Sequence, residues 1–150
     1  MARTKARGSQ QQEFFPLLNE LMRAHHRLSL FDAELHRLSG SGLTAPQAKV
    51  VFCLGNTDGL TCSEITDQTL ITKGTLTGVI DRLEEKALVE RWGDADDGRI
   101  SIVALTRAGD RLYQREYPRY LLQLKTRFDR LASRDREQAT AALTRIADLF

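Results

Sequence analysis

The stretch 72-TKGTLTGVIDRLEEKALVERWGDADDGRISIVALTRAG-109 decides the fold. Its first part has apolar residues at i, i+3, i+4 and i+7, which predicts an amphipathic helix that buries one face: Leu76, Val79, Ile80 and Leu83. Two β-prone runs follow, at 88–92 and 100–105, and they flank a turn at 93–98 that is rich in Asp and Gly. This pattern predicts a β-hairpin directly after the helix.

Three further helices are predicted upstream of this stretch. A long one spans 14–38, where leucines and one phenylalanine form a single apolar stripe, and 39-SGSG-42 ends it. The next begins at 44-TAPQ-47 with a threonine and a glutamine that form a capping box, and it ends at Gly55. A second capping box, Thr61 with Glu64, starts a short helix that ends near Gln68.

Downstream, Thr106 is predicted to cap a long helix from Arg107 to about Leu131, and Ser133 is predicted to start a last helix. Three short helices followed by a β-hairpin are the element order of a winged helix-turn-helix. We therefore expect a mainly α fold with a small β-hairpin wing. In the helix pair 61–68 and 72–86, the second helix would expose its N-terminal half to base edges in the major groove of DNA.

Composition excludes several classes of protein. Hydrophobic residues make up 41% and charged residues 28% of the chain, which is ordinary for a soluble globular protein. The apolar runs are far too short to span a bilayer, and no secretory signal follows the basic segment 1–12, so we expect a cytoplasmic protein. No catalytic constellation or phosphate loop is recognisable, and the three histidines lack the spacing of a metal site. We therefore expect no enzyme, no cofactor and no metal.

Charge alone gives little support for a nucleic-acid partner. The chain has a net charge of +2, but residues 61–107 carry six basic and nine acidic groups, a net charge of −3. This balance favours an alternative in which the fold is a protein-interaction module that does not touch DNA. An interpretation as a DNA-binding protein must rest on the arrangement of particular residues.

Several polar residues of the helix pair and the hairpin are candidate DNA contacts. Lys73 and Arg82 suit phosphates, and the hydroxyl and methyl groups of Thr75 and Thr77 suit base edges. At the hairpin tip, Arg99 could enter a minor groove while the nearby Asp97 orients it. The same residues are also compatible with an ordinary solvated helix face and hairpin tip. The complete candidate set is Ser63, Thr72, Lys73, Thr75, Thr77, Arg82, Asp97 and Arg99.

The segment 94-DADDGRISIVALTRAG-109 resembles the wing signature of MarR-type regulators, a D-x-R followed by an alternating strand that ends in L-T-x-x-G. The matching residues are Asp97, Arg99, Leu105, Thr106 and Gly109. Residues 72–92 are similar to that family's recognition helix and first wing strand, and the resemblance covers roughly Phe14 to the C-terminus. Two positions depart from the pattern: Gly78 stands where the family often has a large polar residue, and Ala87 replaces the usual glycine.

The resemblance implies a homodimer whose N- and C-terminal helices interlock on a palindromic operator in double-stranded DNA. The implied organisation is a flexible basic tail at 1–12, a dimerisation helix at 13–43, the DNA-binding domain at 44–106 and dimerisation helices at 107–150. It also implies a regulator, here expected to be a repressor, that releases DNA when a small organic effector binds.

The effector pocket implied by the resemblance is lined in part by the first helix. Arg23, His25 and His26 could provide a cationic or hydrogen-bonding partner for the carboxylate of an aromatic acid. His25 lies on the apolar stripe, so it could instead be a satisfied core histidine. Cys53 and Cys62 are expected to be buried and reduced. A redox role for Cys62 stays open, because we expect it at a helix N-terminus that would stabilise a thiolate.

Overall fold

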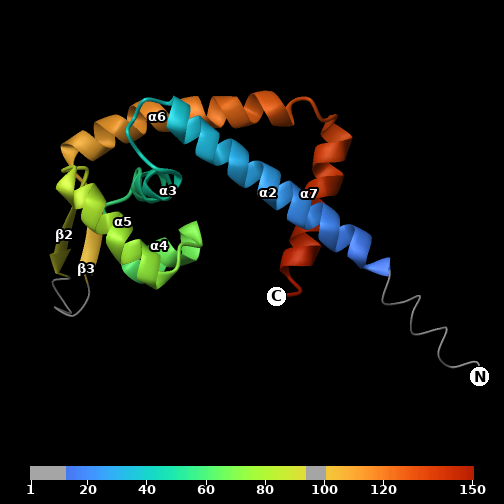
Figure 1. Ribbon diagram of the computed structural model, residues 1–150, viewed down its shortest axis with the longest axis horizontal. Helices are drawn as coiled ribbons and strands as arrows, with labels where there is room; N and C mark the ends of the chain where they lie inside the picture. Colours follow the sequence, from blue (N-terminus) through green and yellow to red (C-terminus); the bar gives the residue numbers. More distant parts are fainter. Residues whose placement is uncertain (1–12, 94–100) are drawn as a thin grey trace, which may run out of the picture. The chain divides into compact units, whose positions relative to one another are not determined.

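The computed structural model describes residues 13–93 and 101–150 (Figure 1). These residues form two compact units that divide between Lys49 and Val50. The first unit contains α2 (Phe15–Leu38) and the beginning of α3 (Ala45–Leu54). The second unit contains the end of α3 and the remaining elements: β1 (Leu60–Thr61), α4 (Cys62–Thr69), α5 (Lys73–Glu85), β2 (Val89–Gly93), β3 (Ser101–Leu105), α6 (Arg107–Phe128) and α7 (Ser133–Ala147).

Helix α2 confirms the long helix that was predicted at 14–38. The Ser39 amide donates to the Leu35 carbonyl at 3.0 Å, and Gly40 and Gly42 then turn the chain with φ values of +68° and +71°. The predicted apolar stripe, however, is only partly covered in the described chain, where Leu21, Phe31 and Leu35 are half-buried. Large apolar side chains remain exposed along the helix and just before it: Phe14, Phe15, Leu17, Leu18, Met22, Leu28, Leu30 and Leu38.

Helix α3 begins with the predicted capping box. The Thr44 amide donates to Gln47 Oε1 at 3.1 Å, and the Gln47 amide donates to Thr44 Oγ1 at 3.4 Å. The buried face is also as predicted, because Val50, Val51 and Leu54 are fully buried. These side chains belong to the central core, which also contains Ile65, Leu76, Ile80, Leu83 and Val103.

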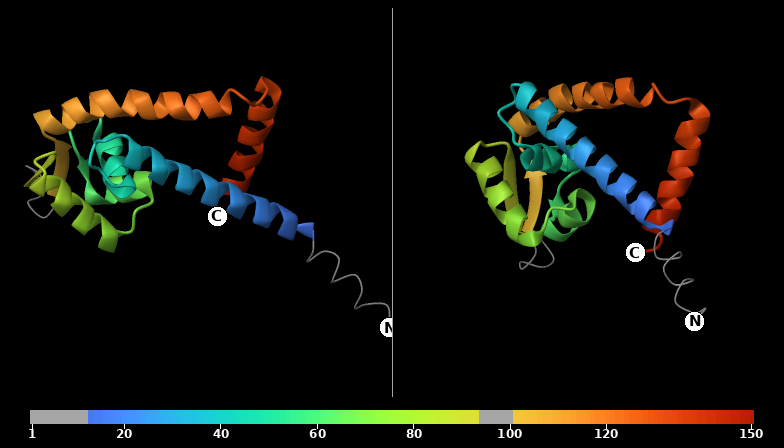
Figure 2. Two further views of the ribbon diagram at one scale, coloured as in Figure 1. Left: turned by 45° about the horizontal axis from the view of Figure 1, so that its top comes forward. Right: turned by 45° about the vertical axis from the view of Figure 1, so that its right-hand side comes forward.

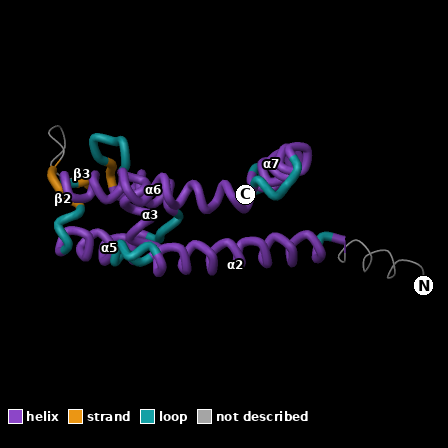
Figure 3. Tube along the Cα trace, turned by 90° about the horizontal axis from the view of Figure 1, so that it is seen from above, coloured by secondary structure: helices purple, strands orange, loops and turns teal. Residues whose placement is uncertain are grey.

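The sheet is antiparallel with strand order β1-β3-β2 (Figure 3, orange strands). Val89 pairs with Leu105 and Trp92 with Ile102, which confirms the predicted hairpin; β2 and β3 together are called the wing below. The strand β1 was not predicted. Leu60 and Thr61 pair with Val103 and Ile102, and a run of two residues is too short to produce a periodic signal.

Helix α5 ends in a left-handed turn at Ala87, which has a φ of +53°. The Ala87 amide donates to the Glu84 carbonyl at 2.7 Å, and the Leu88 amide donates to the Leu83 carbonyl at 2.9 Å. These two bonds satisfy carbonyls that the helix end would otherwise leave open, in the pattern of a Schellman motif. The chain therefore needs a positive φ at the position where glycine would be the least strained residue.

The residue that caps the start of α6 is hydrogen-bonded to this turn. The Thr106 amide donates to the Leu88 carbonyl at 3.1 Å, while the Thr106 hydroxyl donates to the Ala87 carbonyl at 2.7 Å. The same hydroxyl accepts from the Gly109 amide at 3.1 Å, which confirms Thr106 as the cap of this helix. We call this cluster the Ala87–Thr106 joint; it connects the end of α5 to the first turn of α6.

The C-terminal helices meet at an elbow held by Arg136. Helix α6 ends at Phe128 and not at the predicted Leu131. Arg136 Nη1 donates to the carbonyls of Leu131 (2.9 Å) and Phe128 (3.3 Å), and Nη2 donates to Ser133 Oγ at 3.1 Å. The start of α7 at Ser133 is as predicted. No helix in the described ranges is long and apolar enough to cross a membrane.

The Ala87–Thr106 joint predicts that Gly109→Ala strongly destabilises the protein. A Cβ atom at this position would lie 2.0 Å from the Leu88 carbonyl oxygen, and backbone cannot move aside as a flexible side chain can. We expect the free energy of unfolding to fall by about 2 kcal/mol or more, as for other overpacked sites, in urea denaturation followed by circular dichroism. Equal stability of the variant and the wild type would contradict this account of the joint.

Candidate nucleic-acid interface

Helices α4 and α5 form the predicted helix-turn-helix pair (Figure 2). The Glu64 amide donates to Thr61 Oγ1 at 3.2 Å, and the Thr61 amide donates to Glu64 Oε2 at 2.7 Å, which confirms the second capping box. The hydrogen bond from the Thr61 backbone, with a further one from its hydroxyl, lowers the pKa of Glu64. The start of α4, where the candidate residue Ser63 lies exposed, is therefore firmly fixed.

Helix α5 has one buried and one exposed face, as predicted. Leu76, Val79, Ile80 and Leu83 are buried. The outward positions are all exposed: Lys73, Gly74, Thr75, Thr77, Gly78, Asp81 and Arg82. The structure thus brings five of the eight candidate DNA contacts onto the N-terminal cap and the open face of one helix: Thr72, Lys73, Thr75, Thr77 and Arg82.

Thr72 does not cap α5 with its side chain. It is the N-cap residue, but its hydroxyl donates to Thr75 Oγ1 at 3.1 Å and accepts from no amide of the first turn. The Thr77 hydroxyl donates to the Lys73 carbonyl at 3.4 Å. The hydroxyl oxygens of Thr75 and Thr77 lie on the exposed face with free acceptor capacity, as base-edge contacts would require.

Arg91 on β2 fixes the exposed side of α5 to the wing. Its Nη2 donates to Asp81 Oδ1 at 2.5 Å, and its Nη1 lies 3.1 Å from Glu84 Oε2. Asp81 is therefore occupied within the protein and is not simply a solvated polar residue of the helix. Sequence reasoning did not find this role of Arg91, because an ion pair between residues ten positions apart leaves no periodic pattern.

The wing tip lies outside the described residues. Asp97 and Arg99 both fall in the segment 94–100, so their proposed minor-groove contact stays a prediction. The described part of the wing ends at Gly93 and resumes at Ser101, and the exposed Trp92 precedes this gap.

The candidate effector residues Arg23, His25 and His26 are exposed on α2. His25 is therefore not part of the core of the single described chain. Instead α2 buries His36, whose Nε2 lies 3.3 Å from Asp32 Oδ1. Arg23 Nη2 already donates to Glu20 Oε2 at 2.5 Å, in an exposed pair.

The two cysteines differ in their surroundings. Cys62 is exposed in the first turn of α4, so the expectation that it is buried is wrong. Cys53 is half-buried, and its Sγ donates to Gln68 Oε1 at 3.3 Å. Burial, with a smaller contribution from the negative charge of Glu64, raises the pKa of the Cys53 thiol. Cys53 therefore has the properties of an unreactive thiol.

An aromatic cluster connects α3 to α6. The ring of Phe52 lies 5.1 Å from Tyr117 and 5.3 Å from Tyr120, and Tyr113 stacks on Tyr117 at 5.0 Å between ring centroids. The Tyr113 hydroxyl accepts from Asn56 Nδ2 at 2.9 Å. Within the described part of the chain, no group of three or more histidine, cysteine or acidic side chains is placed to hold a metal ion.

Residues 43–101 match the model of the MarR family. The Bacillus subtilis protein YfiV, an uncharacterized HTH-type transcriptional regulator, is 28% identical over 102 residues, which cover 68% of this chain. The Neisseria gonorrhoeae HTH-type transcriptional regulator FarR is 30% identical over 77 residues, or 51% of this chain. The matched regions span only 64% and 53% of the lengths of these two relatives.

Among solved structures, the fold is similar to that of Bordetella bronchiseptica BpsR, with a TM-score of 0.73 and 25% sequence identity. The similarity covers 88% of this chain and 98% of the other. The BpsR structure concerns regulation of its DNA binding by 6-hydroxynicotinic acid. These likenesses confirm the winged-helix fold and the expected family resemblance.

The exposed glycines of α5 predict that Gly78→Ala stabilises the fold. A Cβ atom at position 78 meets nothing within 4 Å, and glycine inside a helix costs roughly 0.5–1 kcal/mol relative to alanine. We expect a gain of about that size in the free energy of unfolding, measured by urea denaturation. Gly74→Ala, where the site is equally open, provides a parallel test, and a loss of stability in both would contradict the described helix.

Proposed function

We propose that this chain is a transcription regulator of the MarR family that binds duplex DNA, because residues 43–101 match that family's model and the fold is similar to that of known regulators. The proposal includes no enzymatic activity. The observation that carries it is the open face of α5, where Lys73, Thr75, Thr77 and Arg82 project from the second helix of a helix-turn-helix.

In this proposal α5 enters the major groove. Thr75 and Thr77 meet base edges there, while Lys73 and Arg82 neutralise phosphates on the groove walls. Among the described residues, neither of these two cations forms a salt bridge. They are therefore available for phosphates, whereas Arg91 is occupied by Asp81 and Glu84. Ser63 at the start of α4 and Thr72 before α5 would add contacts to the DNA backbone.

We further propose a homodimer held together by the terminal helices. Exposed apolar side chains on α2 have counterparts on α6, on α7, in the connection between them and at the C-terminal residues: Leu121, Leu122, Phe128, Leu131, Leu143, Leu149 and Phe150. So much apolar surface is unusual for a monomer and typical of an interface. A twofold dimer presents two equivalent copies of α5, so its operator would be a palindrome with half-sites about one helical turn apart.

A second candidate function is a protein-interaction module with the same fold. The net charge of −3 over residues 61–107 favours it, since it lacks the basic excess of most DNA-binding domains. The arrangement of cations and hydroxyls on α5 favours DNA. The two proposals differ in whether the isolated protein selects a DNA sequence.

The regulator is proposed to act as a repressor that a small aromatic acid releases from DNA. The described regulation of BpsR by 6-hydroxynicotinic acid supports this class of effector. Two groups of residues are candidates for its recognition. Arg23, His25 and His26 on α2 offer positive charge or hydrogen bonds, and the cluster around Phe52 and Tyr117 offers aromatic faces for stacking.

DNA binding is tested with duplexes that the full-length chain selects from a randomised library, with affinity measured by fluorescence anisotropy. Arg99→Ala should weaken binding by about 1–3 kcal/mol without affecting folding. Lys73→Ala should weaken binding to all sequences and lower the slope of log affinity against log salt by about one per subunit. Thr75→Ala and Thr77→Ala should change the preferred sequence, and Asp97→Ala should cost less than Arg99→Ala.

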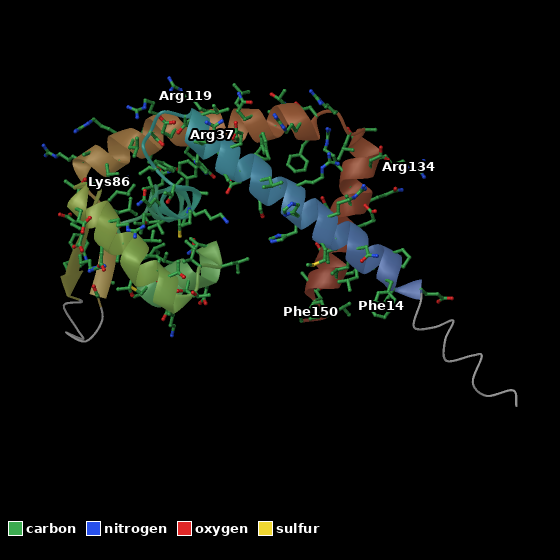
Figure 4. All side chains as sticks on the ribbon, viewed as in Figure 1. Phe14, Arg37, Lys86, Arg119, Arg134 and Phe150 are labelled. Atoms are coloured by element: carbon green, nitrogen blue, oxygen red, sulfur yellow. The ribbon has the colours of Figure 1, made fainter. Side chains whose placement is uncertain are left out.

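Arg134→Ala is the matched control, because this exposed arginine lies on α7, away from the proposed DNA-reading helix (Figure 4). Its affinity should equal that of the wild type. Unchanged binding in Arg99→Ala would support the interaction module instead. Selected sequences with a single asymmetric half-site would contradict the proposed dimer.

Effector response is tested with the double variant Cys53→Ser/Cys62→Ser. Because neither cysteine is among the residues proposed to recognise the effector, we expect aromatic acids to release DNA from the wild type and the variant equally. Release is measured by anisotropy with a panel of aromatic acids and, separately, with peroxide. If peroxide releases only the wild type and no acid acts on either protein, the sensor is a cysteine thiol and the proposed ligand is wrong.

A further inference from the structure

The turn between α4 and α5 contains Leu70, which has a strained backbone conformation and an apolar side chain that is exposed to solvent. Leu70 has a φ of +58° and a ψ of +20°, in the left-handed region where a Cβ atom crowds the backbone. Its side chain is 87% exposed, so it contributes almost no apolar burial in return. A singly exposed leucine is ordinary, but an exposed leucine in a strained conformation needs a reason.

The backbone around Leu70 is fixed by its neighbours. The Leu70 amide donates to the Thr66 carbonyl at 2.9 Å. The Thr69 hydroxyl donates to the Ile65 carbonyl at 2.6 Å and accepts from the Ile71 amide at 3.3 Å. The buried Ile71 then anchors the chain in the core. The backbone conformation of Leu70, and with it the direction of its side chain, is therefore set by the hydrogen bonds and packing of its neighbours.

Among the described residues, two others that are not glycine have a positive φ, Asn56 and Ala87. Neither of them exposes a large apolar side chain. The Asn56 side chain donates to the Tyr113 hydroxyl, and Ala87 carries only a methyl group at the Ala87–Thr106 joint. Leu70 is thus distinguished by what it presents to solvent. It lies three residues before Lys73, so its Cα is within about 11 Å of the first residue of α5.

We propose that Leu70 is a specificity-determining residue that packs against the methyl group of a thymine beside the bases read by α5. An aliphatic side chain cannot hydrogen-bond, so it distinguishes bases only through apolar contact. In the major groove, the C5-methyl of thymine is the apolar group that a base presents. This inference rests on the proposed DNA-binding function and adds a residue and a base to it.

The test is a double-mutant cycle with the full-length chain and the duplex it selects from a randomised library. Each thymine is replaced in turn by uracil, in both half-sites, which removes only the methyl group. The protein is the wild type, Leu70→Gly or Leu70→Asn, since glycine and asparagine both tolerate the left-handed conformation. Ala87→Gly is the matched control, because it relieves the same backbone strain at the other end of α5.

For the wild type, replacement of one particular thymine should weaken binding about fourfold per half-site, the effect of one buried methyl group at about 0.8 kcal/mol. In Leu70→Gly and Leu70→Asn the same replacement should have no effect. Ala87→Gly should keep the wild-type response. The melting temperature of both glycine variants should be equal to or slightly above that of the wild type, which excludes unfolding as the cause.

The inference would be overturned if the ratio of the affinities for the thymine and uracil duplexes were the same in the wild type and both Leu70 variants. The proposed function would then be left intact. A loss of dimer mass in either Leu70 variant, measured by light scattering, would assign Leu70 to a protein contact and would also overturn it. If the wild type selects no duplex at all, the proposed function fails and the inference fails with it.

Discussion

The left-handed turn after α5 is the constraint on which the arrangement of the helix-turn-helix and the wing depends. At this turn the helix must end, the wing must begin, and the first turn of α6 must find its hydrogen-bond partners. Thr106 connects these elements, since its amide and hydroxyl donate to the Leu88 and Ala87 carbonyls while the hydroxyl also caps α6. Gly109 allows the approach because it has no side chain. The resemblance of L-T-x-x-G to a family signature thus has a structural basis.

Features that depend on a few consecutive residues could be predicted from the sequence. The capping boxes at Thr44 and Thr61, the cap at Thr106 and the buried face of α5 were all confirmed, because each is fixed by spacing within one or two helical turns. The exposed positions of α5 followed from the same periodicity. Helix ends were predicted less exactly: α6 stops at Phe128, and Arg136, eight residues further on, binds the carbonyls of Phe128 and Leu131.

Features that depend on contacts between distant residues could not be predicted. The ion pair of Arg91 with Asp81 and the strand at Leu60 need the folded chain to bring their partners together. The exposure of Cys62 and His25 depends on what packs against each helix, which periodicity within the helix does not reveal. Nor does any pattern predict a positive φ at Leu70, because leucine is among the residues that avoid it. For the wing residues Asp97 and Arg99, the sequence is still the basis of the assignment.

The ion pairs of Arg91 with Asp81 and Glu84 also bear on how the proposed regulator would find its DNA site. Residues 61–107 carry nine acidic and six basic groups, and one of the basic groups, Arg91, is already paired within the protein. In the proposed function, such a segment would displace few counterions from a random duplex. Its residence on non-cognate DNA would be short, and sliding along the helix would contribute little to the search. In the proposed function, the protein would find its site mainly by repeated dissociation and three-dimensional diffusion, and most of its molecules would be free in solution at any moment.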